Sequence, residues 1–562
     1  MKRILSLFLF GALIAGCAKI ANQTSAGGEH PWTQPGVLRV ALQQDLKNLN
    51  PLLTSNTTDV LLARLMFEPL ITADPKGNPL PMLTTVVPSL RNGGISKDGL
   101  TITYHLRKDI KWTDGVALTS KDVKFSWQAI MNSNNNVISR NGYDLVKSID
   151  TPDAYTVVVH LKQKFAPFVN TFFAESDSPM EIVPEHILAK YPNVDQIPFN
   201  NEPTVSDGPF RFAEWSRGDH ITLTRNDNFV LGKPKLKRII LKIIPDENTS
   251  VNLLKTHGID WIFQASIDNY PAIKDIPDTR IVWFIPNGYE YLQLNTQRPF
   301  LRDVRVRQAI AYAIDKQRLV DSLTFGQDQV ATADEPPWLW SHDASLKNYP
   351  HDVAKARALL EAAGWTPGSD GVMRKNGQRL TLVLVSDNSN ATRRKVVVEL
   401  QAMLAQVGIH AEIKFFPGEQ LFAPAGEGGI LQNGKFDLSS TGWFAGIDPD
   451  NSSQYTCKNV APAGYNYTRY CSSAMDALQT MALTHYDRAT RKIAYTKIQK
   501  LLMGDVPVIV YWYDRYMEPV SVDFKGFDPN PVEEAWNAWQ WSISGARDSP
   551  LVRFRSCSGC VR

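Results

Sequence analysis

The pattern of apolar and polar positions predicts that the first half of the chain is mostly β-structure. Over residues 100–106, and again over 155–161, apolar and polar side chains alternate as they do in a strand with one buried face. A continuous apolar run at 37–42 predicts a buried strand. The predicted strands of this half lie at 37–42, 100–106, 155–161, 209–212, 221–224, 238–244 and 259–262.

Three helices are predicted between these strands. Apolar residues spaced three and four apart indicate one from Asp59 to Leu70, and another is predicted over 248–255. Thr119 and Asp122 have the spacing of a capping box, in which a hydroxyl and an acid satisfy free backbone N–H groups at the start of a helix. The third helix is therefore predicted to begin at Thr119.

From about residue 291 the pattern becomes that of an α/β protein. Helices are predicted to begin at Asp303, Asp352, Thr392 and Asp487, and strands to lie at 380–385, 410–415 and 508–513. Because a mostly β half precedes an α/β half, the sequence predicts two lobes of different construction.

The beginning of the chain has the pattern of an export signal. Lys2 and Arg3 precede an apolar run at 4–14, which is shorter than the ~20 residues that span a bilayer. Small residues before Cys17 resemble the lipobox of bacterial lipoproteins, which implies a lipid anchor on Cys17. An ordinary cleaved signal is the alternative. Residues 18–35, rich in Gly, Ser, Thr and Pro, are predicted to form a flexible tether.

Length, charge and missing motifs narrow the class of protein. The 562 residues exceed the ~250–300 at which a single core stops growing, so two or three domains are expected. The net charge of +3 falls to +1 without Lys2 and Arg3, and the basic residues are dispersed, which argues against nucleic-acid binding. The sequence has no G-x-S-x-G, H-E-x-x-H, P-loop or EF-hand motif, so a secreted enzyme is the less favoured class. No metal site or cofactor is predicted.

The cysteines indicate an oxidising compartment. Cys457 and Cys471 bracket a short loop and are predicted to form a disulfide; metal binding is less favoured because no His or further Cys lies nearby. Cys557 and Cys560 form a C-x-x-C in a Ser-, Gly- and Arg-rich tail, residues 544–562, that is predicted to be disordered. No βαβ pattern surrounds this motif, so it is not predicted to be redox-active.

Five stretches in order carry a resemblance to a known family. They include DGLTITYHLRK at 98–108, GPF at 208–210, YLQLN at 291–295 with DVRVRQA at 303–309, AGW at 363–365 and DVPVI at 505–509. These stretches resemble the extracytoplasmic solute-binding proteins of peptide-type ABC transporters, solute-binding family 5, which contains oligopeptide- and dipeptide-binding proteins. The resemblance covers about residues 36–543.

The resemblance implies an α/β fold, a two-lobed periplasmic-binding-protein-like clamp with an inserted β-rich subdomain in the first lobe. The implied segments are 36–82, 203–291 and 507–543 for the first lobe, 83–202 for the inserted subdomain and 292–506 for the second lobe. On this interpretation the strand at 508–513 returns to the first lobe. Two crossings, near Leu292 and near Pro507, would then join the lobes.

The resemblance also implies where a ligand binds. Peptide-binding members anchor the ligand's α-amino group on an aspartate three residues after a Gly-Trp pair. Here the pair is Gly442-Trp443, the anchoring position falls on or near Gly446, and Ser440 stands where some members have Arg. These departures argue against a zwitterionic dipeptide and leave open a longer peptide, or a peptide-like or sugar-like solute. The candidate cleft residues are Gly442, Trp443, Phe444, Asp448, Asn466, Tyr467, Ser55, Asn56 and Thr57.

Within this set, Trp443 and Phe444 are expected to form an apolar wall, and Asp448 could instead serve only to stabilise its turn. The family implies three partners: a peptide or peptide-like ligand, a membrane permease and the ATPase that drives it. We expect an exported, lipid-anchored monomer. The alternatives are an oligosaccharide or metal-complex ligand on the same fold, and a chemosensory binding protein.

Overall fold

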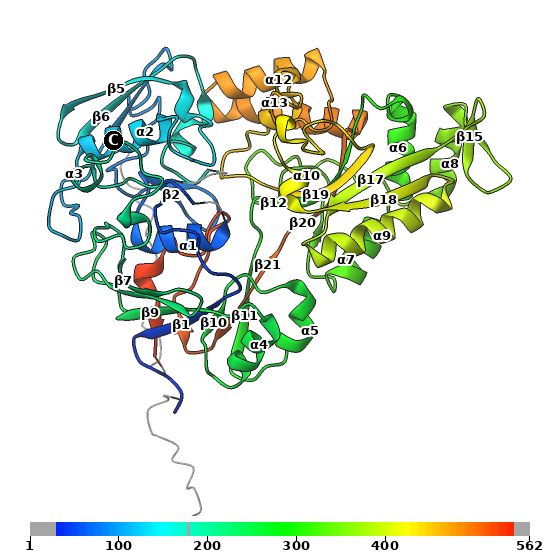
Figure 1. The fold of residues 1–562 in the computed structure, drawn as a ribbon. Helices are drawn as coiled ribbons and strands as arrows, with labels where there is room; N and C mark the ends of the chain where they lie inside the picture. Colours follow the sequence, from blue (N-terminus) through cyan, green and yellow to red (C-terminus); the bar gives the residue numbers. More distant parts are fainter. Residues whose placement is uncertain (1–29, 55, 177–179, 545–562) are drawn as a thin grey trace, which may run out of the picture.

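The computed structural model describes residues 30–54, 56–176 and 180–544. The predicted signal, Cys17, most of the predicted tether, Ser55 and the C-x-x-C of the tail lie outside the described residues. Two large sheets organise the described part, and Figure 1 shows them as two lobes side by side.

The first lobe is built on a seven-stranded sheet. In sheet order its strands are β11 (Thr279–Phe284), β21 (Tyr516–Ser521), β10 (Trp261–Ile262), β1 (Val37–Leu42), β9 (Arg238–Ile243), β8 (His220–Arg225) and β7 (Phe210–Ser216). The predicted strand β1 lies near the middle and pairs in parallel with β9 and β10. The strands predicted at 209–212 and 221–224 are β7 and β8, which pair antiparallel as a hairpin.

A smaller unit, here called the small β-subdomain, packs on this lobe. It consists of β4 (Thr101–His105), β5 (Val146–Asp153), β6 (Thr156–Leu161) and α2 (Ser120–Met131), with the loops at 132–145 and 162–176. Thr119 caps α2, and Asp122 accepts the return bond from the backbone N–H of Thr119, which confirms the predicted capping box.

The second lobe is built on a six-stranded sheet. In sheet order its strands are β13 (Gln329–Val330), β20 (Val508–Tyr513), β12 (Gly288–Leu294), β19 (Leu438–Phe444), β17 (Thr381–Asp387) and β18 (His410–Phe416). The helices of this part of the chain are α6 (Val304–Ala313), α7 (Lys316–Leu323), α8 (Val353–Ala362), α9 (Ala391–Gln406), α10 (Gly418–Leu421), α11 (Ser452–Tyr455), α12 (Ser473–Thr484) and α13 (Arg488–Asp505). Asp303, Asp352 and Asp487 cap α6, α8 and α13 as predicted. The helix predicted to begin at Thr392 begins at Ala391, because the side chain of Asn390 caps it.

The prediction that the strand at 508–513 returns to the first lobe is wrong. β20 pairs with β12 and β13, so both strands that flank the predicted crossings belong to the sheet of the second lobe. The chain passes between the two sheets at 285–287 and at 514–515, a few residues away from Leu292 and Pro507. A six-residue apolar run fits either sheet, because the pattern gives its burial but not its partner.

A helical hairpin, α12 and α13, brings the second lobe against the small β-subdomain. Tyr486, in the turn of this hairpin, donates its hydroxyl hydrogen to the carbonyl of Gly99 at 2.8 Å. Leu483 and Tyr486 pack against the core of the first lobe. The lobes therefore touch along a face that is separate from the two crossings (Figure 1).

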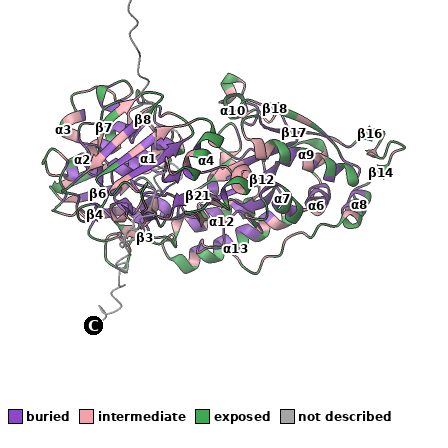
Figure 2. Ribbon diagram, turned by 90° about the horizontal axis from the view of Figure 1, so that it is seen from below, coloured by how far each residue is buried: buried purple, intermediate pink, exposed green. Residues whose placement is uncertain are grey.

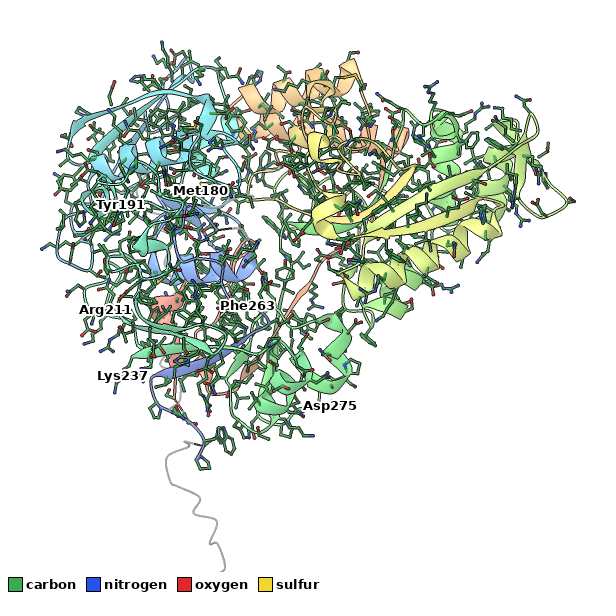
Figure 3. All side chains as sticks on the ribbon, in the orientation of Figure 1. Met180, Tyr191, Arg211, Lys237, Phe263 and Asp275 are labelled. Atoms are coloured by element: carbon green, nitrogen blue, oxygen red, sulfur yellow. A yellow bond between two sulfur atoms is a disulfide. The ribbon has the colours of Figure 1, made fainter. Side chains whose placement is uncertain are left out.

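Each lobe has its own apolar core. Figure 2 shows buried strands inside a rim of exposed helices and loops. In Figure 3, Arg211, Lys237 and Asp275 lie toward the outer edge of the first lobe, whereas Met180 and Phe263, which are 1% and 4% exposed, lie within it. The large core of the second lobe joins α6, α8 and α9 to its sheet.

The remaining helices and strands are short, apart from α1 and α4. They are α1 (Thr57–Met66), α3 (Glu185–Leu188), α4 (Glu247–Lys255), α5 (Tyr270–Ile273), β2 (Ile71–Ala73), β3 (Pro79–Pro81), β14 (Thr366–Pro367), β15 (Met373–Lys375), β16 (Gln378–Arg379), β22 (Phe524–Lys525) and β23 (Ser542–Ile543).

Candidate ligand cleft

A cavity of about 780 Å³ lies between the small β-subdomain and the second lobe. The subdomain contributes loop residues between α2 and β5 and after β6, among them Ile138, Asn141 and Asp144. The second lobe contributes Tyr291 and Gln293 of β12, residues 441–444 of β19 and the loop that follows α11. The volume lies within the ~300–1,000 Å³ range of small-molecule sites, so the cavity is large enough to enclose a ligand between two bodies.

Two smaller cavities continue from this one toward the crossings. One of about 230 Å³ lies against α1, and one of about 290 Å³ lies beside β20 and α9. Phe444 lines all three cavities and its side chain is 46% exposed. The three are therefore adjacent compartments of one cleft.

Gly442, Trp443 and Phe444 end the central strand β19 at this cleft, and all three line the 780 Å³ cavity. Trp443 meets Tyr465 edge to face, with ring centroids 5.9 Å apart. A Cβ at position 442 would lie 2.6 Å from Oε1 of Glu290, which pairs with Arg393. Glycine at this position therefore leaves room for the ion pair beneath the cavity wall.

The loop closed by Cys457 and Cys471 carries further predicted residues. The two sulfur atoms are joined in a disulfide, as predicted. Tyr467 lines the cavity, and burial raises the pKa of its hydroxyl to about 12, so it is a neutral hydrogen-bonding group. Asn466 is fully buried and does not line the cavity. Its amide donates to the carbonyls of Thr456 at 3.1 Å and Tyr470 at 2.7 Å, so it stabilises the loop rather than facing a ligand.

On the first lobe, Asn56 and Thr57 line the 230 Å³ compartment. Asn56 also caps α1, because its Oδ1 accepts from the backbone N–H of Asp59 at 2.9 Å. Its amide is therefore already engaged in the helix start. Ser55, the third residue of this predicted segment, lies outside the described residues.

Asp448 is held by the protein itself. Its carboxylate accepts from both terminal nitrogens of Arg491, at 2.5 and 2.9 Å, and from the amide of Asn170 at 3.3 Å. Burial alone would lower the pKa of the Arg491 guanidinium, but the Asp448 carboxylate raises it above its ordinary value. Its Oδ1 also accepts from the backbone N–H of Asp450 at 3.2 Å, so the carboxylate both bonds within its turn and pairs with Arg491.

Gly446 lies where the second lobe touches the first. A Cβ at this position would lie 2.6 Å from Cα of Ser176, and the next residue, Ile447, donates its N–H to the carbonyl of Glu175 at 3.0 Å. The adjoining cavity is only about 40 Å³. The absence of an acid here therefore has a steric reason, since backbone from the small β-subdomain occupies the space.

Several cleft residues were missed by the sequence prediction. Asp450 lines the cavity, burial raises the pKa of its carboxyl, and it forms no ion pair with any described residue. Lys458 and Asp144 also line it, as do the exposed rings of Phe422 and Tyr465. The sequence carries one signal for two of these residues: Phe422 and Tyr465 are aromatic residues outside the predicted helices and strands.

The floor of the cavity is neutral and polar. Gln293 is 2% exposed, and its amide donates to the hydroxyls of Tyr291 at 2.5 Å and Thr441 at 3.1 Å. Its Oε1 has no hydrogen-bond partner among the described residues, although the residue lines the cavity. This oxygen has almost no exposed surface, so the floor presents hydroxyl and amide groups that are bonded to one another and no free charge.

The described part of the chain has neither a metal-binding cluster nor a membrane-spanning helix. No group of three or more His, Cys, Asp or Glu side chains there could hold a metal ion. None of its helices is long and apolar enough to cross a membrane.

Relatives are found over nearly the whole length of the chain. The chain is 25% identical over 550 residues to the oligopeptide-binding protein AppA of Bacillus subtilis, covering 96% of this chain and 97% of that protein. It is 28% identical over 440 residues to the glutathione-binding protein GsiB of Pectobacterium atrosepticum, covering 77% and 81%.

Solved structures have the same fold. The structure of AppA from Bacillus subtilis in complex with a nonapeptide has a TM-score of 0.74 at 25% identity, covering 91% of this chain and all of that one. NikZ from Campylobacter jejuni in complex with Ni(L-His) has a TM-score of 0.75 at 25% identity, covering 90% and 99%.

The two-lobed α/β fold predicted from the sequence is thus confirmed. Residues 85–464 match the model of the bacterial extracellular solute-binding proteins, family 5. This match covers more than half of the chain, and the chain belongs to that family.

Proposed function

We propose that this protein is the binding component of an ABC importer and that its ligand is an oligopeptide. The observation that carries the proposal is the cleft itself, a cavity of about 780 Å³ with walls from both lobes and two smaller compartments beside it. An elongated ligand of several residues suits such a series of compartments. The family and the peptide complex of the relative AppA support this choice.

The lining suits a peptide held mainly through its backbone. Neutral polar side chains, including Asn141, Ser453 and Asn459, line the cavity together with the rings of Trp443 and Tyr465. Hydroxyl and amide groups can bond peptide N–H and C=O groups without reading side chains. Aromatic rings supply contact area with little loss of side-chain entropy.

The 230 Å³ compartment is more apolar. Val60, Pro286, Phe444, Tyr516 and Val532 line it, and it lies beside the crossing at 285–287. Burying an apolar side chain there contributes about 25 cal/mol for each Å² removed from water. We assign this compartment to an apolar side chain of the ligand.

Capture follows from the two crossings. With the lobes apart the cleft is open, and a ligand that contacts both lobes favours the closed form by its differential affinity for the two states. The protein binds its ligand stoichiometrically, without turnover. The loaded form then docks on a membrane permease that an ATPase drives. We also propose that the protein is a monomer and that a lipid attached to Cys17 anchors it to the membrane.

The test is titration of the purified protein, freed of ligand by unfolding and refolding, with mixed peptides of two to nine residues. Calorimetry should give saturable one-to-one binding, with an optimum above two residues. Binding of a nickel chelate or an oligosaccharide, with no response to any peptide, would contradict the proposal.

A further inference from the structure

Lys458 is the one cation among the described residues that line the 780 Å³ cavity. Its side chain is exposed. No carboxylate of the described residues forms an ion pair with it. The wall of the second lobe therefore presents an ammonium group that the protein does not neutralise.

The backbone on both sides of Lys458 is fixed. Cys457 is joined to Cys471, and its N–H donates to Oδ1 of Asp476 at 2.9 Å. On the other side, the amide of Asn459 donates to the carbonyl of Ser452 at 2.9 Å and to Oγ1 of Thr456 at 2.8 Å. A cation on a pre-ordered segment loses less entropy on binding than one on a free loop.

Side chains of the opposite sign line the same cavity elsewhere. Asp144 of the small β-subdomain and Asp450 of the second lobe line the same cavity. Two carboxylates disfavour a dianionic phosphate, whereas a singly charged carboxylate can bond the ammonium and leave the acids free for other groups. Charge-assisted hydrogen bonds of this kind are stronger than hydrogen bonds between neutral groups.

We propose that Lys458 binds a free carboxylate of the ligand and that the protein selects peptides by their unblocked C-terminus. This inference rests on the proposed function. Anchoring at Lys458 also agrees with Gly446, because the space beside that residue is filled by Glu175 and Ser176. The space beside Gly446 is thus filled by protein, whereas the cation lines the large cavity.

The experiment uses two libraries of random tetra- to hexapeptides without acidic side chains, one with free C-termini and one amidated. Wild-type protein, Lys458→Met, Lys458→Arg and the control Lys435→Met are compared by equilibrium dialysis. Lys435 is an exposed lysine of the same lobe that lines none of the cleft compartments described above, and its substitution makes the same change in net charge.

We expect the wild type to bind the free-acid library about tenfold or more tightly than the amidated one, as charge-assisted hydrogen bonds predict. Lys458→Met should remove this preference, while Lys458→Arg and Lys435→Met keep it. Added salt should weaken binding of the free acids more than of the amides.

Equal binding of both libraries by the wild type would overturn the inference and leave the proposed function intact. An unchanged preference in Lys458→Met would do the same. If neither library binds to any of the four proteins, peptide binding itself is contradicted, and the inference falls with it. A third library, amidated but with one Glu, tells whether a side-chain carboxylate can replace the terminal one.

Discussion

At the scale of single residues, the cleft is defined by what each side chain already bonds to. Asp448 and Asn466 are polar and close to the cavity, but both already have partners in the protein. Asp448 forms an ion pair with Arg491, and the amide of Asn466 donates to the carbonyls of Thr456 and Tyr470. Lys458 and Asp450 have no such ion-pair partners among the described residues. Residue type alone did not separate these two groups, because the partners come from distant parts of the chain.

Trp443→Ala should weaken peptide binding by about thirtyfold or more, since aromatic anchors at interfaces are worth ~2 kcal/mol or more. Trp112→Ala is the matched control. Trp112 is 1% exposed, in the core of the first lobe, so its loss should lower the free energy of unfolding by ~3–5 kcal/mol and leave the affinity of the folded protein unchanged. Calorimetry and urea unfolding measure the two effects. Equal losses of affinity would mean that Trp443 does not form the wall.

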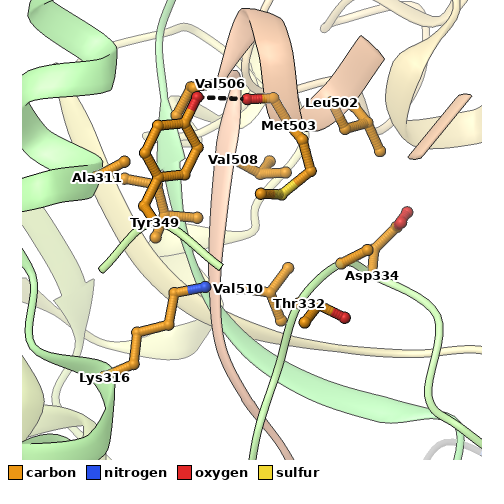
Figure 4. Close-up of a pocket in the computed structure, with 12 residues that line it drawn as sticks. Ala311, Lys316, Thr332, Asp334, Tyr349, Leu502, Met503, Val506, Val508 and Val510 are labelled. Carbon is orange, nitrogen blue, oxygen red and sulfur yellow. Dashed lines mark hydrogen bonds between the residues drawn. The ribbon is translucent and has the colours of Figure 1, made fainter. Parts of the chain in front are cut away.

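Lys316 gives a prediction about pH. Figure 4 shows it beside β20, in a cavity of about 20 Å³ that Asp334 also lines. Its Nζ donates to the carbonyl of Ala331 at 3.0 Å and to Oδ1 of Asn348 at 2.9 Å. Burial lowers the pKa of this ammonium to about 7.

Between pH 7 and its ordinary pKa of 10.5, Lys316 is protonated in the unfolded chain but neutral in the native protein. The unfolded state then binds more protons, so this group makes the free energy of unfolding rise with pH through that window. Lys316→Met should remove this contribution, up to ~5 kcal/mol over the whole window at 1.36 kcal/mol per pKa unit. Urea unfolding at pH 7 to 10 measures it, with Lys435→Met as control. Parallel pH curves for wild type and Lys316→Met would refute this assignment.

At the scale of elements, local signals in the sequence predicted where helices begin but not which strands pair with each other. Thr119, Asp303, Asp352 and Asp487 cap helices as expected, because capping depends on residues only two or three positions apart. The strand at 508–513 was placed in the wrong sheet, because pairing depends on strands more than two hundred residues away. The helix α12 was not predicted.

The cleft residues also divide into those that the sequence predicted and those whose position depends on packing between distant segments. Gly442, Trp443, Phe444 and Tyr467 line the cavity, and their motif or loop could be located by resemblance to the family. The wall contributed by the small β-subdomain, including Asn141 and Asp144, was not predicted. Those residues lie in an irregular loop whose position depends on how the subdomain packs against the second lobe.

The disulfide gives a prediction for the loop that carries Lys458 and Tyr467. Replacing Cys457 and Cys471 together by Ser should lower the free energy of unfolding by ~3 kcal/mol, as for a closed loop of about 15 residues. Affinity should fall as well, because the loop lines the cavity. Unfolding curves and calorimetry test this, with wild type under non-reducing conditions as reference. Two free thiols in the oxidised wild type would refute the pairing.

At the scale of the whole molecule, the lobes are joined by adjacent crossings and touch again across the cleft. Asp514, in the second crossing, donates its N–H to the carbonyl of Gly288, next to the first, at 3.2 Å. Across the cleft, the bond from Ile447 to Glu175 and the contact of Tyr486 with Gly99 link the lobes. This arrangement is that of a closed clamp.

Gly446→Ala should disfavour closure, because the added Cβ would lie 2.6 Å from Cα of Ser176. If the closed form falls to a tenth of the population, the apparent affinity falls about tenfold. Small-angle scattering should show a larger radius of gyration with peptide present than for wild type. Gly504→Ala is the control, since a Cβ at that helical position meets nothing within 4 Å. Wild-type affinity and radius in Gly446→Ala would contradict the closure contact.

The most direct test of peptide binding is to identify the small molecule that the protein carries in its own cells. The protein is purified from its own cells without refolding and denatured, and the small molecules released are identified by mass spectrometry. We predict peptides longer than two residues with free C-termini, in a one-to-one ratio with the protein. Release of a sugar or a metal chelate in that ratio, with no peptide, would contradict the central claim.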